Sequence, residues 1–403
     1  MTNESGFWVV REPLAWPAPP SHLSYSSLGE IESCPLRWAL SRADYGDLWD
    51  GSGYPNRPAP RQLAGEVVHL ALSQVVKALD ASRAVTPGEI ASELRALGGF
   101  ATIIQDCTAT VLGAVSANPR AIDRMESLTQ ALAQSVPVVR LAVQSALNAS
   151  YADGRPAATR SHGPAESGRS PLGLGEHSEV WLAPRSMTFV GRVDLIRIGE
   201  GSCTIVDYKT GDPDPTHDDQ VREYALLWAR DQVVNPAGRL ATALVVIYPG
   251  GTHSVPAPQA SELLELESVI AGRCRSALAA VADPAPKGVV SPERCRYCAV
   301  KHLCASYWTT HGQSLTREEV VPSVRSVEAT LTEQRGDAVW SFVVGLDPYL
   351  APGTAGLVTG RALGRRSPGQ RIRLMDVLVD TDEEDGSVTV TPVSGSEIFL
   401  VPA

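Results

Sequence analysis

Long apolar runs are missing from this 403-residue sequence. None approaches the roughly 20 residues that a membrane-spanning helix requires, so we expect no transmembrane segment. Residues 1–16 contain acidic side chains and prolines where a secretory signal would need a basic and then an apolar stretch. A Gly-x-x-x-x-Gly-Lys phosphate-binding motif is also missing, which excludes an evident ATP-driven motor. These absences predict a cytoplasmic protein without a membrane contact.

Basic residues are fewer than acidic ones, and the formal net charge is -10 at pH 7. Broad coating of nucleic acid depends on neutralising phosphates and releasing counterions, so any DNA binding by this chain must be local. Lysine occurs at only four positions, Lys77, Lys209, Lys287 and Lys301. A lysine inside a chemical motif therefore stands out from the background.

Cysteine is infrequent for a chain of this length, with seven in total. Cys295, Cys298 and Cys304 form a C-x2-C-x5-C pattern, and Cys34 lies far upstream. Few cysteines at ligand spacing indicate a reducing compartment and a metal site rather than a disulfide framework. Four thiolates suit a structural zinc ion or a 4Fe-4S cluster, and the single upstream cysteine favours the cluster. The remaining cysteines are expected to be buried small hydrophobic residues: Cys107, Cys203 and Cys274.

Hydrophobic periodicity divides the rest of the chain into a helical part and a mixed part. Helical spacing predicts helices over 28–43, 61–80 and 91–149, the last within a helical insertion of about 84–150. Residues 153–175 are expected to form a flexible loop, because they are rich in Gly, Pro and Ser. Short β-branched runs and renewed helical spacing then predict strands at 179–182, 189–198, 203–209 and 241–248, and helices at 218–232 and 262–283. This alternation indicates an α/β fold.

Beyond about residue 311 the helical pattern gives way to strand-like runs at 340–346, 356–361, 371–380 and 387–391. An Asp385-Gly386 turn separates the last two runs, as a hairpin requires. We therefore predict a small C-terminal β-barrel or sandwich over 312–403.

The same region holds the densest basic stretch of the chain: Arg361, Arg365, Arg366, Arg371 and Arg373. If the domain is an OB-like barrel, these arginines could contact single-stranded nucleic acid. The acidic run at 380–385 weakens that interpretation and could instead face a basic partner.

The stretch Asp207-Tyr208-Lys209-Thr210-Gly211 carries the clearest chemistry. Side chains alternate along a strand, so Asp207 and Lys209 share one face, and Asp194 on the preceding strand could add a second carboxylate. Oxygen ligands of this kind suit Mg²⁺ or Mn²⁺, which lower the pKa of a bound water and stabilise charge on a phosphate. Lys209 could orient that water or neutralise charge in the transition state. Alone, a D-x-K tripeptide is a weak signal, and an exposed strand face is its more common origin.

Three companions strengthen this prediction. Gly65 and His69 lie on an earlier helix, Gly191 begins the run that contains Asp194, and Gln220 and Tyr224 follow on the next helix. Gln220 and Tyr224 are four residues apart and share one helix face. Glu179, on the strand before Asp194, is a further candidate ligand, with a solvated strand position as an equal alternative.

In this order, the motifs G-x-x-x-H, G-x-x-D, D-Y-K-T-G and Q-x-x-x-Y resemble those of the PD-(D/E)XK nuclease superfamily, specifically its RecB-like exonuclease branch. The cysteine pattern is similar to that of the iron-sulfur members of this branch, the AddB-type nucleases and the CRISPR-associated adaptation nucleases. The resemblance covers roughly residues 23–308. It implies a mixed central sheet flanked by helices, a restriction-endonuclease-like core, in a nuclease domain over 1–311.

The resemblance also implies roles by motif position. In these nucleases the histidine and two acidic residues bind the catalytic metal, the lysine assists hydrolysis, and the Gln and Tyr help to hold the site and the DNA strand. The catalytic residues implied here are Asp194, Asp207, Lys209, His69, Gln220 and Tyr224. The implied ligands of Mg²⁺ or Mn²⁺ are His69, Asp194 and Asp207, and those of the 4Fe-4S cluster are Cys34, Cys295, Cys298 and Cys304.

These features predict a metal-dependent DNA nuclease, an exonuclease by resemblance, that cuts single-stranded or end-containing DNA in repair, recombination or phage defence. A structural 4Fe-4S cluster would brace its core. Nucleases of this branch often work beside a helicase, so we expect an ATPase partner besides DNA. One alternative is a noncatalytic DNA-binding or scaffolding subunit of a helicase-nuclease or defence complex. Another is a zinc-stapled structural protein whose D-x-K is coincidental.

Overall fold

A computed structural model describes residues 8–46, 48–49, 53–82, 84, 86–151, 169–311, 324–347, 349–359, 366–382, 384 and 386–402. The chain divides into two compact units. We call Met1–Pro19, Glu30–Asn56 and Ala280–Ala403 the barrel unit, and Pro20–Gly29 and Arg57–Ala279 the sheet unit. The domain boundary predicted at 311–312 borders residues outside the described ones, as does most of the loop predicted at 153–175, and both stay predictions.

The helix predicted over 28–43 is divided at Cys34 into α1 (Tyr25–Ser33) and α2 (Pro35–Arg42). Cys34 is extended, with φ of -163°, and Pro35 is the first residue of α2. A residue before proline is disfavoured in the helical region, whereas proline itself fits the first helical position. The Pro35 ring therefore ends one helix and starts the next, so the single predicted helix was wrong at this point.

Four helices of the sheet unit form the predicted helical insertion and the helix before it: α3 (Pro60–Ser82), α4 (Pro87–Ala96), α5 (Gly99–Val115) and α6 (Met125–Tyr151). A short 3-10 turn, η2 (Ile122–Arg124), precedes α6. α4 begins with a capping box in which Thr86 and Glu89 satisfy each other's backbone N–H groups. None of the described helices is by itself long and apolar enough to cross a membrane, although α4 and α5, a bent pair, meet that test together.

A five-stranded mixed sheet forms the centre of the sheet unit, in the order β1-β2-β3-β4-β5. Its strands are β1 (Gly175–Leu182), β2 (Gly191–Gly199), β3 (Ser202–Tyr208), β4 (Ala243–Tyr248) and β5 (Gly251–Val255). Only β3 and β4 are parallel, and α7 (Pro215–Arg230) connects them. The predicted mixed sheet is confirmed. β5 was not predicted, because four of its five residues are exposed and it lacks a strand-like apolar face.

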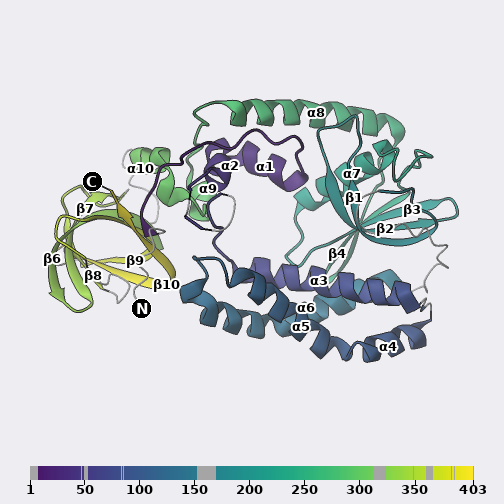
Figure 1. The fold of residues 1–403 in the computed structure, drawn as a ribbon, viewed down its shortest axis with the longest axis horizontal. Helices are drawn as coiled ribbons and strands as arrows, with labels where there is room; N and C mark the ends of the chain where they lie inside the picture. Colours follow the sequence, from purple (N-terminus) through teal and green to yellow (C-terminus); the bar gives the residue numbers. More distant parts are fainter. Residues whose placement is uncertain are drawn as a thin grey trace. The chain divides into compact units, whose positions relative to one another are not determined.

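Helices cover both faces of this sheet (Figure 1). Val206 and Tyr208 of β3 belong to the apolar cluster that α3, α5 and α6 form with the sheet. α7 packs on the opposite face, very close to the start of β2. A Cβ atom on Gly191 would lie 2.8 Å from Cε1 of Tyr224 and 2.9 Å from Cδ1 of Leu227. Only glycine allows this approach, which explains the first residue of the G-x-x-D motif.

The barrel unit contains a closed five-stranded barrel in the order β10-β8-β7-β6-β9. Its strands are β6 (Val324–Gly336), β7 (Val339–Leu346), β8 (Ala355–Thr359), β9 (Arg371–Thr381) and β10 (Val388–Val401). β9 and β10 form the predicted antiparallel hairpin, and β10 also pairs in parallel with β8. Buried side chains including Trp340, Phe342 and Ile372 fill the interior. The predicted C-terminal β-barrel is confirmed, with β6 as a strand that was not predicted.

The remaining helices carry the chain into and through the cysteine segment. α8 (Ala260–Ala282) is the helix predicted at 262–283, and its last residues belong to the barrel unit. In the barrel unit, α9 (Pro292–Arg296), the 3-10 turn η3 (Lys301–Leu303) and α10 (Ala305–His311) follow. The C-x2-C-x5-C pattern therefore lies on short turns and helices rather than on one long element.

Candidate functional site

Three carboxylates lie side by side across the first three strands of the sheet unit. Glu179 lies in the β1–β2 ladder between the pairs Ser178–Leu195 and Val180–Val193, and its carboxylate comes within 4.8 Å of that of Asp194. The β2–β3 ladder ends at the pair Leu195–Val206, and Asp194 and Asp207 are the next residues of the two strands. Like charges this close repel one another unless cations balance them.

Glu179 has a backbone conformation that is rare for a residue with a side chain. Its φ is 53°, in the left-handed region, and the β1–β2 ladder pairs on both sides of it but not at it. Such strained residues persist where the surroundings hold them, often at functional sites. Glu179 also forms an ion pair with Arg192 at 3.0 Å. Burial, followed by the charge of Asp194, raises the pKa of Glu179.

His69 of α3 completes a group of possible metal ligands. Ligand atoms of His69, Glu179 and Asp194 all lie within 4.8 Å of one another. His69 Nδ1 is 3.4 Å from Asp194 Oδ1. Burial would lower the pKa of His69, but the hydrogen bond and charge of Asp194, with Glu179 and Asp207, raise it above its usual value. Glu179, left open by the sequence, thus lies with two of the three predicted ligands.

Asp207, the third predicted ligand, lies outside that group and is held by Lys209. Lys209 Nζ is 2.6 Å from Asp207 Oδ2, and donates to Gln220 Oε1 at 2.8 Å. Gln220 in turn donates through Nε2 to the Tyr224 hydroxyl at 2.8 Å. The predicted face-sharing of Asp207 with Lys209, and of Gln220 with Tyr224, produces one connected chain of polar groups. α7 therefore fixes the lysine ammonium from the side opposite to α3.

Asp207 is almost completely buried, and its ion pair with Lys209 only partly offsets burial and the charge of Asp194. Its side chain is 3% exposed. Burial first, and then the neighbouring charge of Asp194, raises the pKa of Asp207 to about 6, against the lowering effect of Lys209. Asp194 also accepts a hydrogen bond from the Tyr208 backbone N–H at 2.7 Å. The site therefore favours an additional cation.

The glycine of the G-x-x-x-H motif lets α3 approach the catalytic strand. A Cβ atom on Gly65 would lie 3.3 Å from Oγ1 of Thr210, the residue after Lys209. One turn later along the same helix, His69 reaches Asp194. The spacing of this motif therefore combines one close backbone contact with one directed side chain.

A divalent cation fits these residues chemically. Carboxylate oxygens and an imidazole nitrogen, with room for waters, are ligands that Mg²⁺ or Mn²⁺ accepts. The group His69, Glu179 and Asp194 is the one such set of three within the described part of the chain. Asp207 and Lys209 lie beside it, where they could hold and orient water or a phosphate oxygen. The arrangement suits hydrolysis of a phosphate ester.

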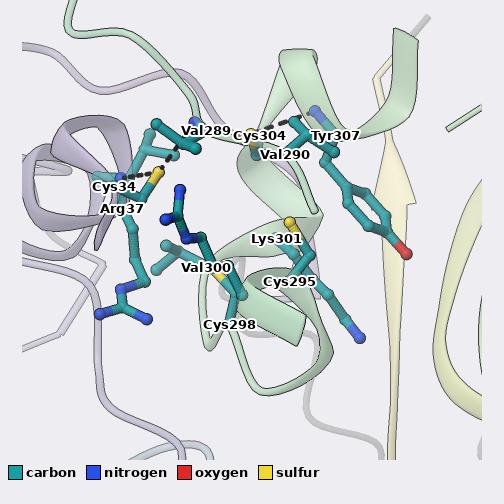
Figure 2. A pocket seen from close by; sticks show the side chains of 12 residues that line it. Cys34, Arg37, Val289, Val290, Cys295, Cys298, Val300, Lys301, Cys304 and Tyr307 are labelled. Atoms are coloured by element: carbon teal, nitrogen blue, oxygen red, sulfur yellow. Dashed lines mark hydrogen bonds between the residues drawn. The ribbon is translucent and has the colours of Figure 1, made fainter. Parts of the chain in front are cut away.

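The four motif cysteines line one pocket in the barrel unit, together with Arg37 (Figure 2). Cys34 Sγ accepts from the backbone N–H groups of Arg37 and Val289, each at 3.4 Å. Cys304 Sγ accepts from the Tyr307 backbone N–H at 3.3 Å. Burial raises the pKa of Cys298 to about 11, so without a metal this thiol is protonated. Backbone donors aimed at sulfur are typical of thiolates that bind metals.

The sulfur atoms do not form a tight cluster. Among the described residues, no three cysteine Sγ atoms lie within 4.8 Å of one another. The cysteines outside the motif behave as predicted, since Cys107, Cys203 and Cys274 are buried. The four motif cysteines therefore share one pocket, whereas the other three cysteines do not line it.

Strand β9 contacts the cysteine-bearing segment within the barrel unit. Lys301, between the last two motif cysteines, is buried, and its Nζ donates to Asp376 at 2.6 Å. Arg373 donates to the backbone carbonyl of His302, and its guanidinium lies 4.8 Å from the centre of the Trp308 ring. These contacts connect the barrel to the cysteine pocket.

The basic stretch of the C-terminal region is partly engaged inside the barrel. Arg371 and Arg373 bind the buried carboxylate of Glu328 at 2.7 and 2.8 Å. Burial would raise the pKa of Glu328, but these two hydrogen-bonded arginines lower it. Two members of the stretch are therefore committed to an internal carboxylate, while Arg361 and Arg365 lie outside the described residues.

We predict that replacing Glu179 separates backbone strain from metal binding. Glu179→Gly and Glu179→Ala should both lose most of the rise in melting temperature that Mn²⁺ gives the wild type. Without metal, the glycine variant should be the more stable of the two by about 1 kcal/mol, because glycine adopts the left-handed conformation without cost. Thermal unfolding with and without Mn²⁺ measures both effects. Equal stability of the two variants would contradict the strained backbone.

Comparison with known proteins identifies the superfamily. A sequence profile described as the PD-(D/E)XK nuclease superfamily matches residues 22–305. No curated protein sequence gives a significant match. A solved structure, the crystal structure of the p204 HINb domain, is 21% identical over 29% of this chain and 56% of that one, with a TM-score of 0.17. This chain thus spans little more than half of that structure, and so low a score carries no argument. By its profile match, the chain belongs to the PD-(D/E)XK nuclease superfamily.

Proposed function

We propose that this protein is a Mg²⁺- or Mn²⁺-dependent deoxyribonuclease, an exonuclease that acts on single-stranded DNA or DNA ends. The observation that carries the proposal is the group of neighbouring carboxylates, Glu179, Asp194 and Asp207, beside Lys209. A poorly compensated set of carboxylates, next to a fixed ammonium, suits a cation and a phosphodiester better than it suits a purely structural role. Membership of a nuclease superfamily supports the same reaction.

Each residue has a proposed part in hydrolysis. His69, Glu179 and Asp194 would hold the cation, with Asp207 as a further carboxylate of the site. When bound, the cation would supply an activated water and neutralise charge on the phosphate. Lys209 would donate to a phosphate oxygen or to the attacking water, and Gln220 would keep its ammonium directed. Tyr224 would position Gln220 through its hydroxyl.

We also propose that the protein belongs to the RecB-like, AddB-like branch and carries a structural 4Fe-4S cluster on Cys34, Cys295, Cys298 and Cys304. The shared cysteine pocket and its backbone N–H donors support this assignment. Around a single zinc ion, Zn–S bonds of about 2.3 Å would bring sulfurs to roughly 3.8 Å from one another. In a 4Fe-4S cluster each thiolate would bind a different iron, and the resemblance to iron-sulfur nucleases is what favours the cluster over zinc.

The proposed setting is DNA repair, recombination or phage defence in the cytoplasm, beside a helicase or another ATPase. A reducing compartment would keep the cysteines free, and an ATPase partner would supply the motor that the sequence lacks. The barrel, a closed five-stranded Greek-key arrangement, is compatible with the OB-like form proposed for it. Its contacts from β9 to the cysteine segment favour a bracing role.

We predict that cleavage depends on Lys209. Wild-type protein, purified without oxygen, should degrade end-labelled single-stranded DNA when Mn²⁺ or Mg²⁺ is present. Lys209→Ala should reduce the rate by at least about a hundredfold, because the transition state loses its fixed cation. Lys287→Ala, which removes another of the few lysines at an exposed position, should retain wild-type activity.

DNA binding without cleavage by either the wild type or Lys287→Ala would contradict a catalytic role. That outcome would favour the noncatalytic binding or scaffolding subunit. A pull-down that returns no ATPase would count against the helicase partner alone.

We predict that the cysteine pocket binds iron and sulfide. Anaerobically purified wild type should contain about four iron and four sulfide per chain and absorb broadly in the visible range. Cys298→Ala should lose this absorption and most of the iron, because one cluster ligand is missing. Cys107→Ala, a buried cysteine outside the pocket, should keep both. Stoichiometric zinc without iron in the wild type would contradict the cluster.

A further inference from the structure

A wide groove lies in the sheet unit next to the loop that follows Lys209. Its open volume is about 890 Å³. One wall comes from α3 and α6, and the other from the loop 210–213 and the turn between β4 and β5. At about 300–1,000 Å³, pockets commonly enclose a drug-sized molecule, so this groove has room for one or two nucleosides.

The helical wall of the groove is made of small aliphatic side chains. Ala64 of α3 and Ala131 and Val138 of α6 form its accessible part, and the buried Val68 and Val139 lie behind them. Val138 is 56% exposed. Flat apolar faces suit such a surface, whereas the outside of a duplex presents phosphates. Unstacked bases of a single strand expose such faces.

Both walls of the groove also carry charged or titratable side chains. Arg61 of α3 is exposed and has no ion pair or hydrogen bond to another described residue. His253, on the opposite wall, is paired with Asp218 at 3.1 Å. Asp212 on the loop is the acidic exception in the lining. Arg61 is therefore available to a phosphate at the rim.

The groove is continuous with the proposed catalytic strand. Thr210 and Gly211, which line it, directly follow Lys209 in the chain. Gly65, whose packing against Thr210 fixes this loop, lies between Ala64, which lines the groove, and His69, one turn further along α3. A strand whose phosphate lies at Lys209 must continue along one of the surfaces beside it, and this groove is such a surface.

We propose that the groove binds the unstacked bases next to the scissile phosphate, and so selects single-stranded DNA or a frayed end over an intact duplex. This inference rests on the proposed nuclease function. Base faces lie on Ala64, Ala131 and Val138, and Arg61 contacts the backbone. Val138 contacts a base and sets the preference for strands that contain bases.

The test compares two exposed valines of α6, Val138 in the groove and Val136 outside its lining. Each is changed to glutamate in the full chain, so both variants gain the same charge on the same helix. Binding is measured by fluorescence anisotropy in Ca²⁺ with an oligothymidylate and with an abasic oligomer of equal length. A duplex of equal length is the third ligand.

Wild type and Val136→Glu should bind the oligothymidylate about tenfold more tightly than the abasic oligomer, and more tightly than the duplex. Val138→Glu should bind the first two ligands equally, with an unchanged melting temperature. Equal binding of both oligomers by the wild type, or the same loss in both variants, would overturn the proposal.

Hydrolysis of bis(p-nitrophenyl) phosphate by the wild type, measured in parallel with Mn²⁺, separates the two proposals because this substrate has no base. Hydrolysis without a base preference would support the proposed nuclease site and contradict base binding in the groove. A base preference without hydrolysis would support the groove as a binding site and count against catalysis.

Discussion

Repulsion among three carboxylates on neighbouring strands is the constraint on which the site depends. Glu179 and Asp194 have ligand atoms within 4.8 Å of one another, and burial and then the charge of Asp194 raise the pKa of Asp207. Groups that can carry positive charge reduce this repulsion from both faces of the sheet. His69 approaches on α3, and Lys209 is directed by Gln220 of α7. A divalent cation would neutralise the remaining negative charge of the carboxylates, so the same charge cluster would explain both metal binding and catalysis.

The two motif glycines follow from the same constraint. Gly191 lets Tyr224 of α7 pack against the start of β2, and Gly65 lets α3 pack against Thr210. Both helices must lie this close for short polar side chains to reach the carboxylates. A substitution at either glycine would therefore move a helix that directs a functional group, although neither glycine contacts a ligand. In the barrel unit, a direct side-chain contact, from Lys301 to Asp376, connects the cysteine segment to β9.

The sequence predicted most helices, the mixed sheet and the barrel, because their periodicity is local. The proximity of Asp194 to Asp207 could also be predicted, since a two-residue turn joins Gly199 to Ser202 and sets the β2–β3 register up to the pair Leu195–Val206. The sequence could not decide whether Glu179 is a metal ligand or a solvated strand residue. The connection from β1 to β2 is longer, and a left-handed φ has no signal in a glutamate. The basic stretch was predicted as a possible contact for single-stranded nucleic acid, but Arg371 and Arg373 bind Glu328 inside the barrel. The sequence did not indicate this, because Glu328 lies on a strand that was not predicted.

The most direct test of the account is thermal unfolding of metal-free wild type and Asp207→Asn across pH 4 to 7, with and without Mn²⁺. The folded-state pKa of Asp207, about 6, is above its ordinary value of 3.8, so the fold favours the neutral form. The wild type should therefore lose stability, on the order of 2 kcal/mol, as the pH rises through this range. Asp207→Asn should lack that loss, and Mn²⁺ should stabilise the wild type far more than the variant. The same pH profile in both proteins, or equal stabilisation by Mn²⁺, would contradict a cation site that includes the buried carboxylate of Asp207.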